Sequence, residues 1–308
     1  MIPMADLTVA LGSKLTLQNP ILTASGTFGY GDEVPELVDV DRLGGLVTKS
    51  ITRQPREGHP PPRIAETPAG MLNAIGLANI GVERFCAEKL PYLAGLNTAV
   101  FVSIAGSSFD EYQEVMKIIE ARQPAITGYE INVSCPNVDE GGMEFGISAG
   151  MTEELTSSLR QLTERFLMVK LSPNVTDISE IALAAQAGGA DAISAINTVV
   201  GMGIDPRTGK FQLSNGIGGL SGPAIRPVAL AAVYKIAQVV NIPVIGIGGI
   251  MTAEDVAAFI RAGACAVQIG TANYRDPAVG IRLVAQLHSF LEELGVGRLS
   301  EIRGSAHP

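Results

Sequence analysis

Residues 243–271 read PVIGIGGIMTAEDVAAFIRAGACAVQIGT, and their pattern indicates the class of fold. A short apolar run, Pro243–Ile247, ends in a glycine pair, and a second run, Ala266–Ile269, ends in a glycine and a threonine. The residues between the two runs have a helical pattern. Thr252 with Asp255 resembles a capping box in which Asp replaces the usual Glu or Gln. A strand, a helix and a second strand in this order indicate a βαβ unit of a parallel sheet.

The same alternation runs through the whole chain of 308 residues. The predicted strands are Pro20–Ala24, Gly45–Thr48, Ala99–Ile104, Tyr129–Val133, Phe166–Leu171, Ala192–Ile196, Pro243–Ile247 and Ala266–Ile269. The predicted helices are Val82–Leu93, Asp110–Arg122, Thr152–Arg165, Asp177–Ala187, Ala224–Val239, Ala253–Ala262 and Pro277–Leu294. Eight repeats and this length favour a single α/β domain over residues 1–308, a (β/α)8 TIM barrel, over the alternative of a doubly wound open sheet.

Two long segments interrupt this alternation. Ile51–Ile80 follows the second strand, and Val199–Gly222 follows the sixth. Both leave the predicted barrel at the same end and are long for connectors. We therefore expect these insertions to wall a site or to contact a partner.

Composition excludes several classes of function. The net charge is −9, from 22 basic and 31 acidic residues without a basic stripe, which disfavours nucleic acid as a partner. No apolar run is long enough to span a bilayer, and the N-terminus lacks a signal-peptide pattern, so we expect a cytoplasmic protein without membrane contact. The three cysteines are far apart in sequence, which predicts neither a local metal site nor an iron–sulfur cluster.

Polar side chains and glycines stand at the predicted carboxyl ends of the strands, where barrels place their chemistry. In chain order they are Ser25, Gly26, Lys49, Ser50, Ser103, Asn132, Cys135, Lys170, Asn197, Thr198, Gly248, Gly249, Gly270 and Thr271. Glycine turns after the seventh and eighth strands commonly bind phosphate through backbone N–H groups. The sequence therefore predicts a phosphate-bearing ligand or cofactor.

Cys135 lies where the fourth strand ends, directly before a proline. A free cysteine alone is most often a small buried hydrophobe. Here the thiol follows two polar residues of a strand end and precedes a predicted loop, Asn137–Gly142. That position suits chemistry on a small molecule.

Several motifs, spread in order over nearly the whole chain, resemble the dihydroorotate dehydrogenase family. They are Thr48–Ser50, Leu72–Leu77, Asn132–Asn137, Val169–Pro173, Asn197–Thr198, Gly248–Ile250 and Gly270–Thr271. The resemblance implies a TIM barrel that binds one FMN and oxidises (S)-dihydroorotate to orotate in pyrimidine (UMP) biosynthesis. It implies that a proton leaves carbon five to a base and that a hydride leaves carbon six to the flavin.

The resemblance also points to a branch of the family. A cysteine base in place of serine makes the chain resemble the soluble class of the family. Within that class, the segments Asn137–Gly146 and Asn73–Leu77 resemble those of the NAD-linked branch. That branch works with a second subunit that carries FAD and a [2Fe–2S] cluster, so we expect a homodimeric core that binds this subunit in a heterotetramer. The alternative is the fumarate-linked branch, which acts alone as a homodimer.

The resemblance implies a role for each matched residue. Cys135 is the expected catalytic base. The expected substrate-binding residues are Lys49, Asn73, Ala74, Ile75, Gly76, Leu77, Asn132, Asn197 and Thr198. The expected FMN-binding residues are Ser25, Lys49, Ser50, Ser103, Asn132, Lys170, Ile196, Gly222, Gly248, Gly249, Gly270 and Thr271.

Two further readings remain open on the residues themselves. An FMN barrel could act on another pyrimidine or on a hydroxy acid, although a hydroxy-acid oxidase needs a histidine base and none of the three histidines follows a predicted strand. A non-redox phosphate-binding barrel, an aldolase or isomerase, could use Lys170 to form a Schiff base.

Overall fold

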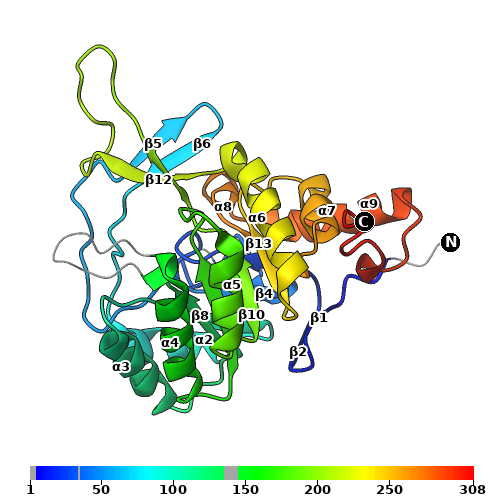
Figure 1. Cartoon of the computed structure of the whole chain (residues 1–308), viewed down its shortest axis with the longest axis horizontal. Helices are drawn as coiled ribbons and strands as arrows, with labels where there is room; N and C mark the ends of the chain where they lie inside the picture. The colour runs from blue at the N-terminus through cyan, green and yellow to red at the C-terminus, as the bar shows by residue number, and fades with distance from the viewer. Residues whose placement is uncertain (1–4, 34, 135–144) are drawn as a thin grey trace.

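Eight parallel strands form a closed barrel in the computed structural model, which describes residues 5–33, 35–134 and 145–308 (Figure 1). The strands are β3 (Ile21–Thr23), β4 (Gly45–Val47), β7 (Ala99–Ile104), β8 (Gly128–Asn132), β9 (Phe166–Leu171), β10 (Ala192–Ala195), β13 (Val244–Ile247) and β14 (Ala266–Ile269). Each pairs with its neighbours in chain order, and β14 closes the ring on β3. The predicted (β/α)8 barrel is confirmed, and the open sheet is wrong.

Helices lie between consecutive strands over most of the barrel. They are α1 (Val82–Glu88), α2 (Leu90–Leu93), α3 (Phe109–Glu120), α4 (Ala149–Arg160), α5 (Ile178–Ala187), α6 (Arg226–Val239), α7 (Ala253–Arg261), α8 (Ala272–Arg275) and α9 (Val279–Glu293). Short 3-10 helices are η1 (Val40–Arg42), η2 (Phe145–Ile147), η3 (Pro223–Ile225) and η4 (Leu299–Glu301).

Local chemistry explains where these helices depart from their predicted bounds. The predicted helix Val82–Leu93 is divided at Lys89, and Pro91, which has no N–H to donate, stands in the first turn of α2. Helix α4 begins three residues before the predicted Thr152, because the Ser148 hydroxyl accepts a hydrogen bond from the N–H of Met151 and caps the helix. The capping box predicted at Thr252 and Asp255 is present.

The strands form the core because they are apolar and covered on both faces. All six residues of β9 are buried, as are all five of β8. Parallel strands buried on both faces have continuous apolar runs rather than alternation, which is why the strands were readable from the sequence. The polar exceptions within these runs point into the barrel and matter for the site.

The two insertions form one sheet. Ile51–Ile80 contains β5 (Ile64–Thr67) and β6 (Gly70–Asn73), and Val199–Gly222 contains β11 (Val199–Met202) and β12 (Ile217–Ser221). The antiparallel order is β11-β12-β6-β5, so strands from both insertions pair directly. In Figure 1, β5, β6 and β12 lie together at one end of the barrel.

A further hairpin, β1 (Val9–Leu11) with β2 (Leu15–Leu17), precedes the first barrel strand. Within the described residues, no helix combines the length and the apolar character that a membrane crossing would require.

Candidate active site

A cavity of about 1300 Å³ lies where the carboxyl ends of the barrel strands meet the sheet of the two insertions. Nearly all the predicted site residues line it: Ser25, Lys49, Ser50, Asn73, Ala74, Ile75, Gly76, Leu77, Asn132, Lys170, Ile196, Asn197, Thr198, Gly222, Gly248, Gly249, Gly270 and Thr271. Cys135 and the predicted loop that follows it lie outside the described residues.

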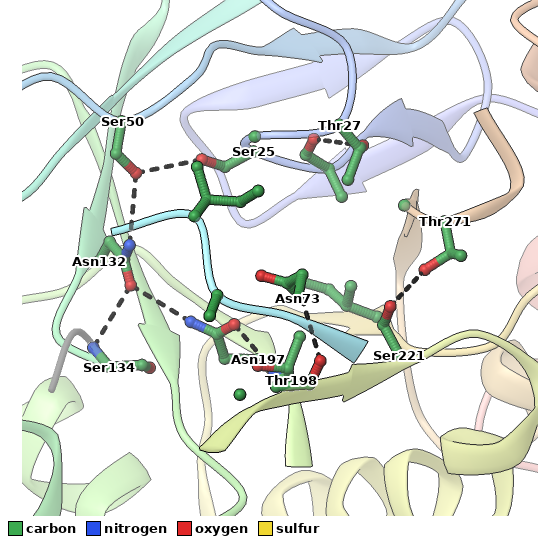
Figure 2. A pocket seen from close by; sticks show the side chains of 18 of the residues that line it. Ser25, Thr27, Ser50, Asn73, Asn132, Ser134, Asn197, Thr198, Ser221 and Thr271 are labelled. Atoms are coloured by element: carbon green, nitrogen blue, oxygen red, sulfur yellow. Dashed lines mark hydrogen bonds between the residues drawn. The ribbon is translucent and has the colours of Figure 1, made fainter. Parts of the chain in front are cut away.

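A chain of hydrogen bonds joins the ends of four strands along one wall of the cavity (Figure 2). Ser25 Oγ lies 3.2 Å from Ser50 Oγ, and Asn132 Nδ2 donates to Ser50 Oγ at 3.3 Å. Asn197 Nδ2 in turn donates to Asn132 Oδ1 at 3.4 Å. Ser103, a predicted FMN-binding residue, does not line the cavity: it is fully buried, and its Oγ lies 2.8 Å from Ser50 Oγ.

The amide of Asn132 is held in one orientation. Its Oδ1 accepts a hydrogen bond from the N–H of Ser134 at 3.3 Å as well as the bond from Asn197. The hydroxyl of Tyr112, from α3, donates to the backbone carbonyl of Asn132 at 2.7 Å. The side chain is therefore preorganised, with its NH2 group toward Ser50 and its carbonyl oxygen toward Asn197.

Asn73 is held by the opposite insertion. Its Nδ2 donates to the carbonyl oxygen of Gly219 at 3.1 Å. A Cβ on Gly219 would collide with Thr198 Oγ1, so β12 passes directly against Thr198, the residue that precedes β11. The paired insertions thus place Asn73 beside Thr198 and Asn197 on the cavity wall.

Lys49 brings a half-buried cation to the cavity. No hydrogen bond or ion pair joins its Nζ to any residue of the described chain. Desolvation lowers the pKa of Lys49, the nearby Arg63 lowers it further, and the Glu33 carboxylate acts in the opposite direction. A cation that lines a cavity without a protein partner suits an anionic group of a ligand.

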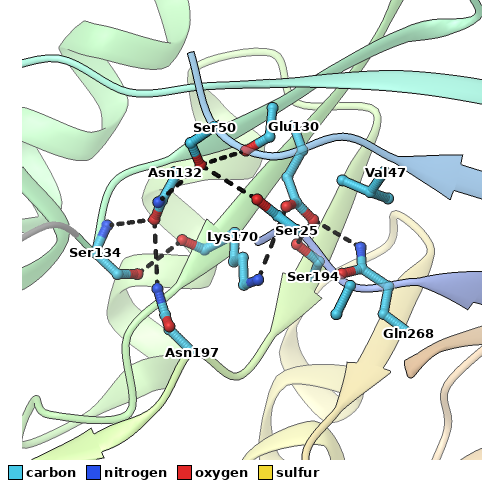
Figure 3. Close-up of polar contacts among 12 residues, drawn as sticks. Ser25, Val47, Ser50, Glu130, Asn132, Ser134, Lys170, Ser194, Asn197 and Gln268 are labelled. Atoms are coloured by element: carbon cyan, nitrogen blue, oxygen red, sulfur yellow. Dashed lines mark hydrogen bonds and ion pairs between the residues drawn. The ribbon is translucent and has the colours of Figure 1, made fainter. Parts of the chain in front are cut away.

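Lys170, on the floor of the cavity, belongs to a buried polar cluster whose other members were not predicted as site residues (Figure 3). The Glu130 carboxylate, fully buried inside the barrel, lies 3.9 Å from Lys170 Nζ. Its Oε2 accepts hydrogen bonds from Ser194 Oγ at 3.0 Å and Gln268 Nε2 at 2.7 Å. The signal in the sequence was a polar residue inside an otherwise apolar strand, Glu130 in β8 and Gln268 in β14, but that signal does not specify which residues surround it.

Glycines form a tight cradle at the ends of β12, β13 and β14. Gly222, Gly248 and Gly249 have φ values of 89°, 136° and 72°, and a Cβ on Gly249 would stand 2.7 Å from the carbonyl oxygen of Gly222. Side chains are excluded there. Within the described chain, no hydrogen bond is donated by the backbone N–H groups of four residues that line the cavity: Gly248, Gly249, Gly270 and Thr271.

One histidine reaches the cavity through an insertion. His59 lines the wall and packs against the backbone of Gly76, whose added Cβ would lie 2.7 Å from the His59 ring. Cys86 and Cys265 are buried away from the cavity, and burial raises the pKa of both thiols. No group of three or more His, Cys, Asp or Glu side chains in the described residues could hold a metal ion.

A closed parallel barrel whose polar strand ends and glycine turns open into one large cavity is the arrangement typical of enzyme barrels. Residues 8–291 match the dihydroorotate dehydrogenase family, and the chain belongs to it. Members of this family are flavin-dependent in general.

Several relatives are similar over almost their full length. The chain is 48% identical over 300 residues to the protein of Geotalea uraniireducens named dihydroorotate dehydrogenase B (NAD(+)), catalytic subunit, covering 97% of this chain and 98% of the relative. A Bacteroides fragilis protein of the same name is 48% identical over 304 residues, covering 98% and 99%. A Solibacter usitatus protein, named provisionally as dihydroorotate dehydrogenase A (fumarate), is also 48% identical, covering 94% and 95%.

A solved structure has the same fold. The dihydroorotate dehydrogenase of Eimeria tenella, crystallised with ferulenol, aligns with a TM-score of 0.83 at 22% identity, covering 98% of this chain and 89% of that one.

Proposed function

We propose that this chain, acting as one barrel unit over residues 1–308, is the FMN-containing catalytic subunit of an NAD-linked dihydroorotate dehydrogenase. It oxidises (S)-dihydroorotate to orotate for pyrimidine biosynthesis. The observation that carries the proposal is that the family's motif residues, which come from separate strands, line one cavity. The names of the relatives at 48% identity support the same activity.

The residues present fit FMN. A volume of about 1300 Å³ exceeds the roughly 300–1,000 Å³ typical of small-molecule sites, which leaves room for a flavin and a pyrimidine together. The free N–H groups of the cradle around Gly249 and Thr271 suit the FMN phosphate. Lys170 supplies a cation on the cavity floor, where it would stabilise negative charge on a flavin. When bound, FMN supplies the acceptor for the hydride from the substrate.

The residues proposed for the substrate offer complementary chemistry. Lys49 has no protein partner in the described chain and would pair with the carboxylate of dihydroorotate. Asn73, Asn132 and Asn197 each present an amide with both donor and acceptor atoms, as a pyrimidine ring with alternating N–H and C=O groups requires. Hydrogen bonds within the protein keep these side chains oriented before the substrate arrives: Asn197 donates to Asn132, and Asn73 donates to the Gly219 carbonyl.

Cys135 is the proposed general base that removes the proton from the substrate. The support is the sequence motif alone, since Cys135 lies outside the described residues. The described strand β8 ends at Asn132, three positions before it, on the cavity wall.

The electron acceptor separates two candidate functions. The relatives named catalytic subunit imply a second subunit, for which we propose FAD and a [2Fe–2S] cluster and a passage of electrons to NAD⁺. A homodimeric core that binds this subunit as a heterotetramer is part of the proposal. The relative assigned provisionally to the fumarate enzyme, equally identical, favours a homodimer that uses fumarate as the second candidate.

Anaerobic mixing of the purified flavin-containing chain with dihydroorotate tests the proposal. The absorbance of oxidised flavin should bleach rapidly and return with NAD⁺ only after the companion subunit is added. Return with fumarate alone would support the second candidate. A flavin that stays oxidised would refute dihydroorotate as substrate, and a colourless protein that binds no FMN would favour a non-redox barrel.

A further inference from the structure

Glu130 is an anion sealed inside the barrel directly beneath the cavity. Its exposed fraction is 0%, and the barrel strands enclose it. Two donors, Ser194 Oγ and Gln268 Nε2, both bind its Oε2, at 3.0 and 2.7 Å. Two donors on a single oxygen are an arrangement suited to a carboxylate, which accepts hydrogen bonds and donates none.

The other carboxylate oxygen has a different environment. Glu130 Oε1 is buried and accepts no hydrogen bond within the described chain, and it lies 3.9 Å from Lys170 Nζ. That separation is too long for a hydrogen bond but short enough for strong attraction in a dry interior. Glu130 therefore attracts the ammonium of Lys170 without using any of its N–H groups.

Lys170 is itself 6% exposed and lines the cavity, so its charge has lost most of its water. A buried cation is stabilised by a nearby counter-charge. The register places Lys170 beside Asn132 on one side and Ser194 on the other, and Glu130 is the acidic residue that forms an ion pair with it in the described chain.

We propose that Glu130 is a positioning residue for flavin chemistry: its charge holds the Lys170 ammonium directed at the cavity while leaving the N–H groups of Lys170 free to donate to the bound flavin. Ser194 and Gln268 hold the carboxylate for this task from two other strands. The inference rests on the proposed function only in taking FMN as the occupant of the cavity; it does not depend on the substrate.

The test is the midpoint potential of bound FMN in the variant Glu130→Gln, measured by dye-coupled photoreduction without dihydroorotate. Glutamine keeps the size of the side chain, and its amide oxygen can still accept both hydrogen bonds, so the charge is the main change. We expect a lower potential than in the wild type, shifted in the same direction as in Lys170→Met. Reduction by dihydroorotate should slow about tenfold, less than the roughly hundredfold loss when a preorganised charge partner is removed outright.

Glu120→Gln is the matched control. Glu120 is also a paired glutamate, which accepts from Arg165 Nε at 3.1 Å and from the Tyr129 hydroxyl at 2.8 Å, but it lies away from the cavity. This variant should lose stability and keep the wild-type flavin potential.

An unchanged potential in Glu130→Gln would overturn the proposal and leave Glu130 a purely structural residue. A raised potential would also overturn it, because Glu130 would then act as a direct opposing charge on the flavin. The Glu130→Asp variant, which retains the anion at a greater distance, should recover part of the potential. If wild-type FMN has a measurable potential but is not reduced by dihydroorotate, the proposed substrate fails and the test of Glu130 still stands.

Discussion

Asn73 Nδ2 donates a hydrogen bond to the backbone oxygen of Gly219 at 3.1 Å, and the two residues belong to different insertions. One insertion thereby orients a polar side chain that the other contributes to the cavity. One N–H of the Asn73 amide is used by the protein, and the carbonyl oxygen of Asn73 stays available to a ligand N–H. The sheet of the insertions is part of the site rather than a cover placed over it.

The substitution Asn73→Asp should weaken substrate binding while the flavin stays bound. It preserves the shape but sets a carboxylate oxygen against the Gly219 carbonyl, and repulsion should turn the side chain away. An unpaired buried polar group costs about 1–3 kcal/mol, so we expect the KM for dihydroorotate to rise roughly tenfold or more. Steady-state kinetics measures this, with Asn241→Asp at an exposed bend as the control. A KM equal to that of the control would contradict the role.

Replacing Cys135 with alanine should leave FMN bound and slow its reduction by dihydroorotate by about two to four orders of magnitude, the usual contribution of a general base. In the wild type, the reduction rate should rise with pH toward the thiol range near pKa about 8.5, because only the thiolate can accept the proton. Stopped-flow absorbance under anaerobic conditions measures both. Cys86→Ser, in a buried position of α1, is the control. Near-normal reduction in Cys135→Ala would remove the thiol from the mechanism.

The pH dependence of orotate binding should report on Lys49. Desolvation lowers the pKa of Lys49, so its charge is lost at a lower pH than the ordinary lysine value of about 10.4. Affinity for the carboxylate should therefore be highest at low pH and fall as pH rises through the lowered pKa. Glu33 raises that pKa, so Glu33→Gln should move the fall to lower pH. Titration of the flavin spectrum with orotate measures it, and Glu36→Gln on the same loop should behave as the wild type; identical curves for all three proteins would refute the assignment.

A methyl group in the glycine cradle should weaken FMN binding. In Gly249→Ala the new Cβ would stand 2.7 Å from the Gly222 oxygen and 2.8 Å from Arg226 Cβ, so the loops must separate. Gly295 has a similar φ of 68° but no atom within 4 Å of its Cβ, so Gly295→Ala shares the backbone strain, about 1–2 kcal/mol, without the clash. We expect a tenfold or greater rise in the Kd for FMN only in Gly249→Ala, measured by quenching of flavin fluorescence. Equal affinities would show that the cradle does not hold the phosphate.

Local sequence patterns were sufficient to predict the barrel but not how the strands of its two insertions pair with each other. Runs such as Phe166–Leu171 and the capping box at Thr252 are set by neighbours in sequence, so eight strands and their carboxyl ends could be read directly. The pairing of β6 with β12 joins residues about 150 positions apart, and nothing local specifies it. Glu130 escaped notice for the same reason: a lone acid in an apolar strand has meaning only once Lys170, Ser194 and Gln268 are known to surround it.

The ion pair of Glu130 and Lys170 should affect the free energy of unfolding as well as the midpoint potential of the flavin. Removing one member of a buried ion pair leaves the other charge without compensation and typically costs about 3–5 kcal/mol. Lys170→Met leaves the fully buried Glu130 carboxylate in this position, with two hydrogen bonds but no cation. We therefore expect a marked loss of unfolding free energy in this variant, measured by urea denaturation of the FMN-free protein.

The double variant Glu130→Gln with Lys170→Met should recover much of that loss, because neither buried charge remains. Its flavin potential should stay low, since stability returns without the cation. The two measurements therefore report different effects. The loss of stability in Lys170→Met reports the unpaired Glu130 carboxylate, and the low flavin potential reports the missing ammonium. If the double variant were less stable than Lys170→Met, the glutamate would stabilise the barrel through Ser194 and Gln268 rather than through its charge pair, and the low potential of Glu130→Gln would need another cause.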